Sequence, residues 1–215
     1  MLLSTAYFPP AAWFALVARD MTLSPDRVSP STVFLEAHES YQKQSWRNRA
    51  CILAGDGVQM LQVPMVHAGS MLISEVQVDW STPWLVRTQR ALDAAYYTSA
   101  YYEYYRDDLF AVMDMKPALL WDWNLSLVRF ILDKTGLACR FVPTESFTPP
   151  GTVPDDYRYV LHPKRPDTVL RDLGLEKPYY QVFSDRFGFT PGLSALDLLF
   201  NEGPDAILWL KRVFG

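Results

Sequence analysis

The chain has 215 residues, of which 49% are hydrophobic and 14% aromatic, so it can bury a sizeable core and has the usual size of one domain. Its 20 basic and 24 acidic side chains give a net charge of -4, so no global positive field is available to hold a phosphate backbone. No run reaches the roughly 18 to 20 apolar residues of a membrane-spanning helix, and the apolar first residues lack the basic segment of a signal peptide. We therefore expect one cytoplasmic domain over residues 1–215, with no nucleic-acid partner and no membrane insertion.

The first half of the chain opens with a strand, a turn and a helix. Residues 1–8 read as a buried strand, and a proline pair separates them from an apolar helix over 11–18. Residues 32–36 form a second short strand that leads into the polar stretch 39–49. This polar stretch follows a strand end, where site residues are common.

A β-hairpin is the clearest local signal. Apolar runs at 50–53 and 58–66 flank a turn with Asp56-Gly57, a favoured hairpin sequence because both positions tolerate positive φ. Residues 73–78 alternate in a period of about two, which predicts another, half-exposed strand.

The rest of the chain is mainly helical. The apolar spacing over 83–135 predicts at least two helices, with Gly136 as a C-terminal cap and a returning strand at 139–142. Residues 144–167 are rich in proline and turn residues, which predicts an irregular connection, and further helices follow at 194–200 and 204–213. The predicted fold class is α/β: a mixed sheet with a strand-turn-helix opening, a β-hairpin region and a central helical stretch.

Three cations and two amides gather within eight residues, at Gln42, Lys43, Arg47, Asn48 and Arg49. The planar fork of arginine donors suits a carboxylate or phosphate, and neighbouring amides can orient sugar hydroxyls. These residues are therefore candidates for binding a small anionic or sugar-containing ligand.

The same stretch also has a structural interpretation, as an exposed polar loop whose charges pair with Glu36 or Glu39. His38 directly precedes the stretch and is a weak candidate for a general base near neutral pH. The histidines form no H-E-x-x-H or comparable pair, so we expect no metal site.

Ser194 and Asp197 can be read as a nucleophile with a carboxylate, but Ser-x-x-Asp before an apolar run also resembles a capping box. We favour capping, because the serine would accept from a free N–H at the helix start and the acid suits the positive end of the dipole.

Six tyrosines lie between residues 96 and 105, and four of them share a helical face: Tyr97, Tyr101, Tyr104 and Tyr105. They can stack on a sugar or a base, but packing in the core or at an interface, including a homo-oligomer interface, is the favoured interpretation. The phosphate loop, the dinucleotide fingerprint and the nucleophile elbow are absent from the sequence, and we expect no cofactor.

In four stretches, and in the same order, the chain resembles the WbqC-like family. They are Tyr7-Phe8-Pro9-Pro10 with Trp13 and Phe14; Tyr41-Gln42-Lys43 with Trp46, Asn48 and Arg49; Leu61 to Pro64 followed by the aromatic region from Tyr96 to Tyr105; and Leu193 to Asn201 with Gly203-Pro204. The chain departs from the family in the segment 156–175, which is shortened and lacks a Tyr-Leu-Ser-Gly-like turn.

The family's association with O-antigen and other surface-polysaccharide gene clusters implies a role in modifying a sugar or nucleotide-sugar. Transfer of a small acyl or aminoacyl group to such a sugar is the leading hypothesis for this chain. On this reading Arg49 and Lys43 hold an anionic group, Gln42 and Asn48 orient it, and Tyr7, Ser194 and Asp197 meet them in one pocket. The competing hypothesis is a non-catalytic binding or assembly protein that uses its aromatic residues as a partner surface.

Overall fold

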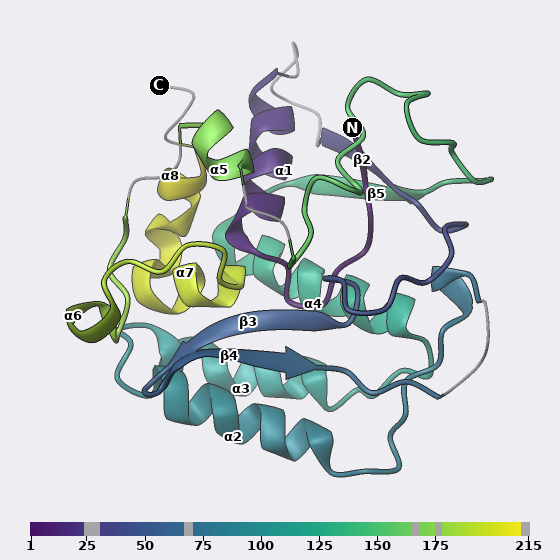
Figure 1. The fold of residues 1–215 in the computed structure, drawn as a ribbon. Coiled ribbons are helices and arrows are strands. Elements are labelled where there is room, and N and C mark those ends of the chain that lie inside the picture. Colours follow the sequence, from purple (N-terminus) through teal and green to yellow (C-terminus); the bar gives the residue numbers. More distant parts are fainter. Residues whose placement is uncertain (24–30, 67–70, 165–167, 175–177, 212–215) are drawn as a thin grey trace.

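A computed structural model describes residues 1–23, 31–66, 71–164, 168–174 and 178–211. The fold is mixed α/β, as predicted, with a parallel three-stranded sheet and a separate antiparallel hairpin among helices (Figure 1).

The parallel sheet has the strand order β1-β2-β5, with β1 at Leu2–Leu3, β2 at Ser31–Leu35 and β5 at Cys139–Pro143. Helix α1, Ala11–Leu23, is the crossover that makes β1 and β2 parallel, and it packs against β2. The predicted strands at 32–36 and 139–142 and the predicted early helix are confirmed.

The predicted first strand, at 1–8, is wrong in its length. The chain leaves the sheet after Leu3, and Tyr7 N–H donates instead to the carbonyl of Trp46 at 2.8 Å. Phe8 has a φ of 40°, which no strand accommodates. These residues are apolar because they are buried, not because they pair in a sheet.

A further segment extends the sheet beyond β1. Leu2 N–H donates to Asp155 O at 2.9 Å and Leu2 O accepts from Tyr157 N–H at 3.0 Å, which gives a parallel bridge between Leu2 and Asp156. On either side of Leu2, the carbonyls of Met1 and Leu3 accept from Phe34 and Glu36 N–H on the β2 side, so residues 155–157 lie on the opposite edge of β1. The chain thus runs to one side of β1 through β2 and to the other side through residues 155–157.

The hairpin is confirmed, with β3 at Arg49–Ala54 and β4 at Gly57–Gln62, and Gly57 takes a φ of 122° at the turn. It lies between α7 on one side and α2 on the other (Figure 1). The strand predicted at 73–78 is wrong, because Ile73–Glu75 forms the 3-10 helix η1 and the rest makes only isolated bridges. Ile73, Val76 and Val78 are nevertheless buried. The alternating pattern therefore indicates which side chains are buried, although the segment does not pair as a strand.

Three helices fill the central stretch: α2 at Trp84–Tyr96, α3 at Tyr102–Met113 and α4 at Leu120–Thr135. Gly136 ends α4 with a φ of 68°, as predicted. The break between α2 and α3 means that the tyrosines around it do not share one helical face.

Irregular chain follows β5, as predicted for the described part of 144–167, and the remaining helices are short. They are α5 at Val169–Asp172, α6 at Ser184–Phe187, α7 at Ala195–Glu202, the 3-10 helix η2 at Gly203–Asp205 and α8 at Ala206–Lys211. The helix predicted over 204–213 therefore begins as 3-10, and residues 212 and 213 lie outside the described part.

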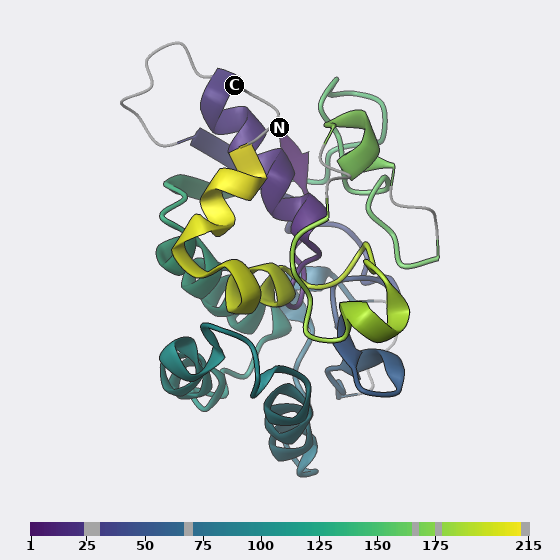
Figure 2. The same cartoon turned by 90° about the vertical axis from the view of Figure 1, so that its left-hand side faces the viewer.

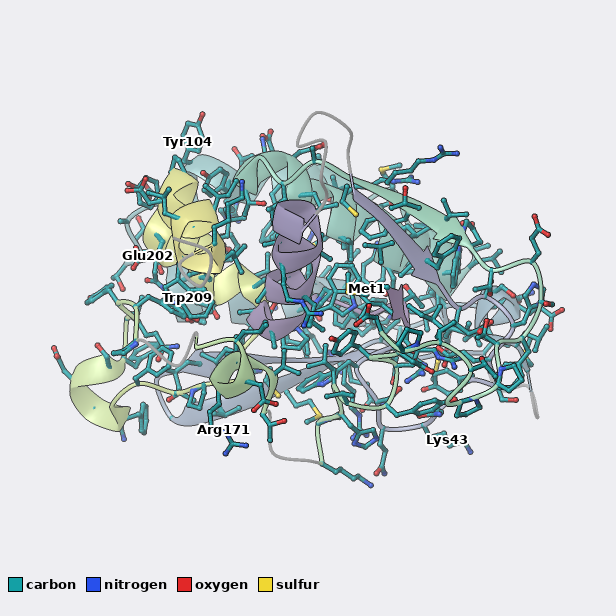
Figure 3. All side chains as sticks on the ribbon, turned by 90° about the horizontal axis from the view of Figure 1, so that it is seen from above. Met1, Lys43, Tyr104, Arg171, Glu202 and Trp209 are labelled. Carbon is teal, nitrogen blue, oxygen red and sulfur yellow. The ribbon has the colours of Figure 1, made fainter. Side chains whose placement is uncertain are left out.

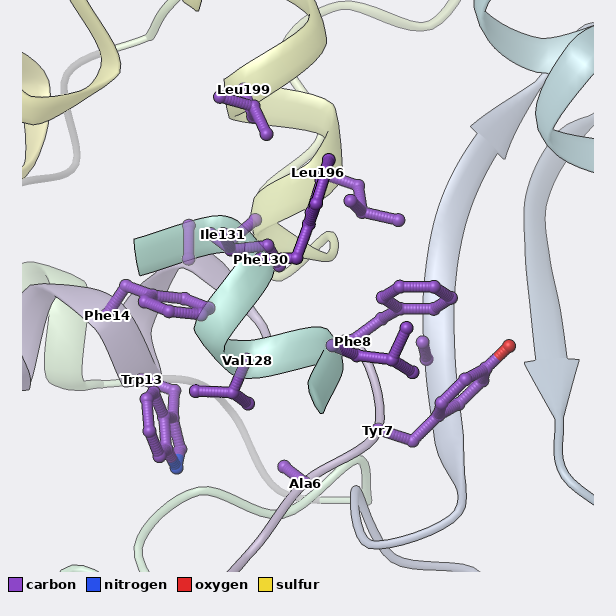
Figure 4. Close-up of a cluster of buried hydrophobic side chains, with 14 of the residues drawn as sticks. Ala6, Tyr7, Phe8, Trp13, Phe14, Val128, Phe130, Ile131, Leu196 and Leu199 are labelled. Carbon is purple, nitrogen blue, oxygen red and sulfur yellow. The ribbon is translucent and has the colours of Figure 1, made fainter. Parts of the chain in front are cut away.

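The core is formed where α1, α4 and α7 meet the segment after β1. Figure 2 shows α1 beside α7 and α8, with α2 and α3 at the opposite end of the molecule from the N-terminus. Side chains from each of these elements converge in Figure 4, among them Tyr7, Phe8, Phe14, Ile131, Leu196 and Leu199.

Gly203, between α7 and α8, has a φ of 56°, and a Cβ there would lie 2.5 Å from Tyr101 Cδ1. We expect Gly203→Ala to lower the free energy of unfolding by about 2 to 3 kcal/mol, because it adds overpacking to backbone strain. Gly151→Ala is the matched control, since its φ is 81° but a Cβ there would meet nothing within 4 Å. Urea unfolding of both variants measures the difference, and equal losses would contradict the clash.

Candidate functional site

The carboxyl ends of the parallel strands meet at one edge of the sheet. Ser4 and Thr5 follow β1, Glu36 follows β2, Thr144 follows β5 and Arg158 follows the added segment. In open α/β sheets, ligands bind outside this edge, at the point where successive connections run to opposite sides. Here that point lies between β1 and residues 155–157.

A buried ion-pair network crosses this edge. Arg158 Nη1 donates to Glu36 Oε2 at 2.9 Å, and its Nε and Nη2 bind the two oxygens of Asp156 at 2.8 and 2.6 Å. The side chains of Arg158 and Glu36 have 0% exposure. Thr144 Oγ1 and Thr148 N–H also donate to Glu36, at 2.7 and 2.9 Å, so its carboxylate is held from several directions.

Burial raises the pKa of Glu36, but hydrogen bonds from Thr144, Thr148 and His38 and the charge of Arg158 outweigh it, so that the pKa lies below its ordinary value. The pKa of Asp156 is also lowered, because the Arg158 bonds and charge outweigh its burial. Both carboxylates are therefore ionised at neutral pH.

A second buried pair lies beside the first. Arg47 Nε donates to Glu39 Oε1 at 2.8 Å, and its Nη2 bonds to Glu39 Oε2 and, at 2.7 Å, to Ser4 Oγ. The side chains of Arg47 and Glu39 are 3% and 2% exposed. For Arg47 the structural interpretation, pairing with Glu39, is confirmed, although the pair is buried and not on an exposed loop.

The two pairs flank a small recess outside the end of β1. It is lined by Leu3, Ser4, Thr5, Ala6, Trp13, Trp46, Arg47, Tyr157, Arg158 and Leu161. It leaves about 20 Å³ for the centre of a water molecule, which is room for about one water. Aromatic rings and guanidinium groups thus surround a space for one small chemical group.

Several buried polar atoms around this edge have no hydrogen-bond partner among the described residues. They are Thr5 Oγ1, Asn48 Oδ1, Trp123 Nε1 and Asn124 Oδ1. Buried polar groups are normally paired, and ordered water is the usual partner where protein is not.

The predicted polar stretch is divided by the structure. Gln42 is half-buried, and Lys43 is exposed at the periphery (Figure 3). His38 is half-buried two residues beyond Glu36, to which its backbone N–H donates at 3.0 Å. The chain therefore places His38 near the carboxyl edge of the sheet.

Asn48 and Arg49 point to different places. Asn48 is 2% exposed, and its Nδ2 donates to Val63 O at 3.1 Å, which fixes the loop to the end of the hairpin. Arg49 is partly exposed on β3, where its Nε donates to Gln62 Oε1 across the hairpin at 3.2 Å.

Tyr7 is fully buried, and its ring stacks on Trp123 with centroids 5.3 Å apart. Burial raises the pKa of its hydroxyl strongly. Its neighbour segment meets the start of α7, since Ala195 N–H donates to Pro9 O at 2.8 Å. Tyr7, Asn48 and Ser194 are thus all in the interior, where their elements meet, and none of them lines the recess.

Ser194 caps α7, as predicted, with Oγ accepting from Leu196 N–H at 3.2 Å. Asp197 does not complete a capping box. Its carboxylate is 1% exposed and accepts from Tyr179 Oη at 2.8 Å and Gln181 Nε2 at 3.0 Å. Burial raises its pKa to about 6, although the side chains of Tyr179, Tyr96 and Gln181 lower it in part.

The tyrosines between residues 96 and 105 divide into buried and exposed members. Tyr96 and Tyr102 pack on Phe200 with ring centroids 5.0 and 4.9 Å away, whereas Tyr97 and Tyr104 are 67% and 76% exposed. Figure 3 shows Tyr104 far from Lys43. An aromatic partner surface would therefore lie away from the polar stretch.

The sequence did not single out Ser4, Thr5 or Arg158. Arg158 falls in the predicted irregular connection, and the local pattern gives no sign that residues 155–157 join the sheet. The Asp-x-Arg spacing of Asp156 and Arg158 was the one available signal, because it allows a bidentate local pair.

Within the described residues, no group of three or more His, Cys, Asp or Glu side chains is arranged to hold a metal ion. Of the three histidines in the sequence, His67 lies outside the described part. Among the helices that the structure describes, none has the length and apolar character needed to cross a membrane.

Comparison with known proteins gives one family match, to the WbqC-like protein family over residues 6–159. Arg47, Asn48, Arg49 and Arg158 lie inside this range, whereas the stretch from Leu193 to Pro204 lies beyond it. No curated protein and no solved structure matches the chain.

Proposed function

Because this chain belongs to the WbqC-like protein family, which is tied by name to polysaccharide-biosynthesis genes, we propose that it transfers a small acyl or aminoacyl group to a sugar or nucleotide-sugar. The observation that carries the proposal is the aromatic-lined recess with buried Arg47 and Arg158 at the carboxyl edge of the parallel sheet. Surface-polysaccharide synthesis is the setting in which such a transfer is needed.

The chemistry of this edge suits a sugar acceptor. Indole and phenol rings present apolar faces, while guanidinium groups held in place by carboxylates offer hydrogen bonds of fixed direction to hydroxyl or carbonyl oxygens. Trp46 and Tyr157 line the recess together with Arg47 and Arg158. Since Glu39 holds the Arg47 guanidinium, the remaining donor of Arg47 is preorganised for binding.

In this proposal Arg49 and Lys43 hold an anionic group of the substrate and Gln42 orients it, while buried Asn48 fixes the loop that carries them. His38 is the candidate base, because it follows Glu36 at the same edge. Tyr7, Ser194 and Asp197 support the site from the interior.

The direct test is to incubate the purified protein with nucleotide-sugars and acyl or aminoacyl donors and to detect acylated sugar by mass spectrometry. A thermal-shift panel of the same compounds selects the candidates, since a ligand that binds only the folded state raises the unfolding temperature. Transfer to a sugar supports the proposal. Binding without any transfer across the panel counts against an enzyme.

Arg49→Ala is expected to weaken binding of an anionic nucleotide-sugar by about tenfold or more, because it removes a charge-assisted hydrogen bond. It should leave stability nearly unchanged, since Arg49 is partly exposed and bonds only to the Gln62 amide among the described residues. Arg171→Ala, which removes another exposed arginine, is the control. Calorimetric titration measures both, and unchanged affinity in Arg49→Ala would remove Arg49 from the site.

A second candidate function is a non-catalytic assembly protein, and the exposure of Tyr97 and Tyr104 favours it. A Tyr97→Ser, Tyr104→Ser double variant would then lose self-association or partner binding in sedimentation experiments. It would leave ligand binding at the carboxyl edge of the sheet unchanged.

A further inference from the structure

The recess outside β1 has the size and the donors for a single oxygen atom. Its free space is about one water molecule, so neither a sugar ring nor a phosphate group fits inside it. One oxygen of a larger ligand fits, provided that the rest of the ligand remains outside. The question is therefore which kind of oxygen the lining side chains prefer.

Thr5 provides the first donor. This residue lines the recess and is 2% exposed, yet its hydroxyl has no hydrogen-bond partner in the part of the chain that the structure describes. A buried hydroxyl without a partner is costly, so whatever occupies the recess completes its hydrogen bonding.

Arg47 provides the second donor. Its Nε and Nη2 are used by Glu39 and Ser4, which leaves Nη1 without a hydrogen bond to any described residue. Because Glu39 binds Nε and Nη2 together, the guanidinium plane is fixed and Nη1 is the donor left for a ligand. Arg158, in contrast, already bonds to Asp156, Glu36 and the carbonyl of Thr148.

The net charge of the buried side chains determines whether a neutral or a highly charged ligand group is favoured in the recess. The two arginines are outnumbered by the carboxylates of Glu36, Glu39 and Asp156, which leaves the buried network with one net negative charge. A phosphate dianion would be repelled by this excess, whereas a carbonyl oxygen brings no net charge. The donors are therefore better matched to a carbonyl group.

We infer that the recess lined by Thr5 and Arg47 binds the carbonyl oxygen of an acyl group. This inference rests on the proposed function in naming the acyl group of a donor as the natural ligand. The binding itself is a property of the recess and can be measured without any turnover.

Formamide, the smallest amide carbonyl, is the probe. A ligand of three heavy atoms gains at most about 1.5 kcal/mol per atom, so its dissociation constant is on the order of 1 mM or weaker. Titration of the ¹⁵N-labelled protein at constant ionic strength should shift the indole N–H signals of Trp13 and Trp46, which line the recess. Inorganic phosphate, titrated in the same way, should leave them in place.

Thr5→Val removes the hydroxyl and keeps the shape of the side chain. We expect the formamide dissociation constant to rise about three- to tenfold, with the urea midpoint unchanged or higher because an unpaired buried hydroxyl is lost. Ser99→Ala is the matched control: Ser99 Oγ is also buried and unpaired among the described residues, but Ser99 does not line the recess. It should bind formamide as the unaltered protein does.

The outcomes separate the two proposals. If formamide leaves the Trp13 and Trp46 signals in place, or if Thr5→Val binds it with unchanged affinity, the recess is a site for structural water and the inference is overturned. Stronger binding of phosphate than of formamide also overturns it. If the protein binds formamide but transfers no acyl group, the recess is still a carbonyl-binding site and the proposed function is rejected.

Discussion

Arg158→Met is expected to lower the free energy of unfolding by about 3 to 5 kcal/mol, because it leaves buried carboxylates without their cation. The side chains of Arg158 and Glu36 are 0% exposed, and Asp156 is 9% exposed. A typical domain has only about 5 to 15 kcal/mol in total, so the urea midpoint should fall sharply.

The same substitution at an exposed pair is the control. Arg106 binds Asp93 with side chains 37% and 35% exposed, and Arg106→Met should cost about 1 kcal/mol or less. Similar losses in the two variants would mean that the buried network adds nothing beyond a surface pair.

Acid gives a second check on Arg158→Met. Without the Arg158 side chain, Asp156 loses the hydrogen bonds and the charge that lower its pKa, so burial favours its protonated form and protonation relieves the penalty. The gap between the unaltered protein and the variant should therefore narrow as the pH falls from 7 towards 4. A gap that stays constant with pH would place the lost stability in packing rather than in charge.

Sequence reasoning succeeded where short-range chemistry decides the structure. Asp56-Gly57 encodes its own turn, Gly136 its own cap, and Ser194 its own hydrogen bond to the start of α7. Each of these features depends on residues no more than a few positions apart.

Sequence reasoning failed where contacts between segments far apart in the chain decide the structure. The bridge between Leu2 and Asp156 has no local signal, yet it creates the strand order that positions Arg158. Residues 73–78 have the right alternation of burial but no neighbouring strand to complete a ladder. The cation–amide stretch was found, but the sequence cannot show that Arg47 turns inward to Glu39 while Arg49 stays on the hairpin surface.

Asp197→Asn is expected to make the protein more stable at pH 7. Burial raises the pKa of Asp197 from 3.8 to about 6, so the folded state favours the neutral acid. The stabilisation that the neutral Asp197 side chain gives the folded state is fully present below about pH 4. It is lost as the pH rises through about 6, a change of roughly 3 kcal/mol. Asparagine is neutral at every pH, and its Oδ1 can still accept from Tyr179 and Gln181.

The difference in unfolding free energy between Asp197→Asn and the unaltered protein isolates this group. Glu36 and Asp156, whose pKa values are lowered, lose stabilisation in acid in both proteins, so their effect cancels. Urea unfolding from pH 4 to 7 should show the difference growing in favour of Asp197→Asn. For Asp107→Asn, at a side chain that is 91% exposed, the unfolding free energy should change with pH as it does in the unaltered protein. If Asp197→Asn shows that same pH dependence, the Asp197 carboxylate stays ionised through this range. The protein must then stabilise the buried charge more strongly than Tyr179 and Gln181 account for.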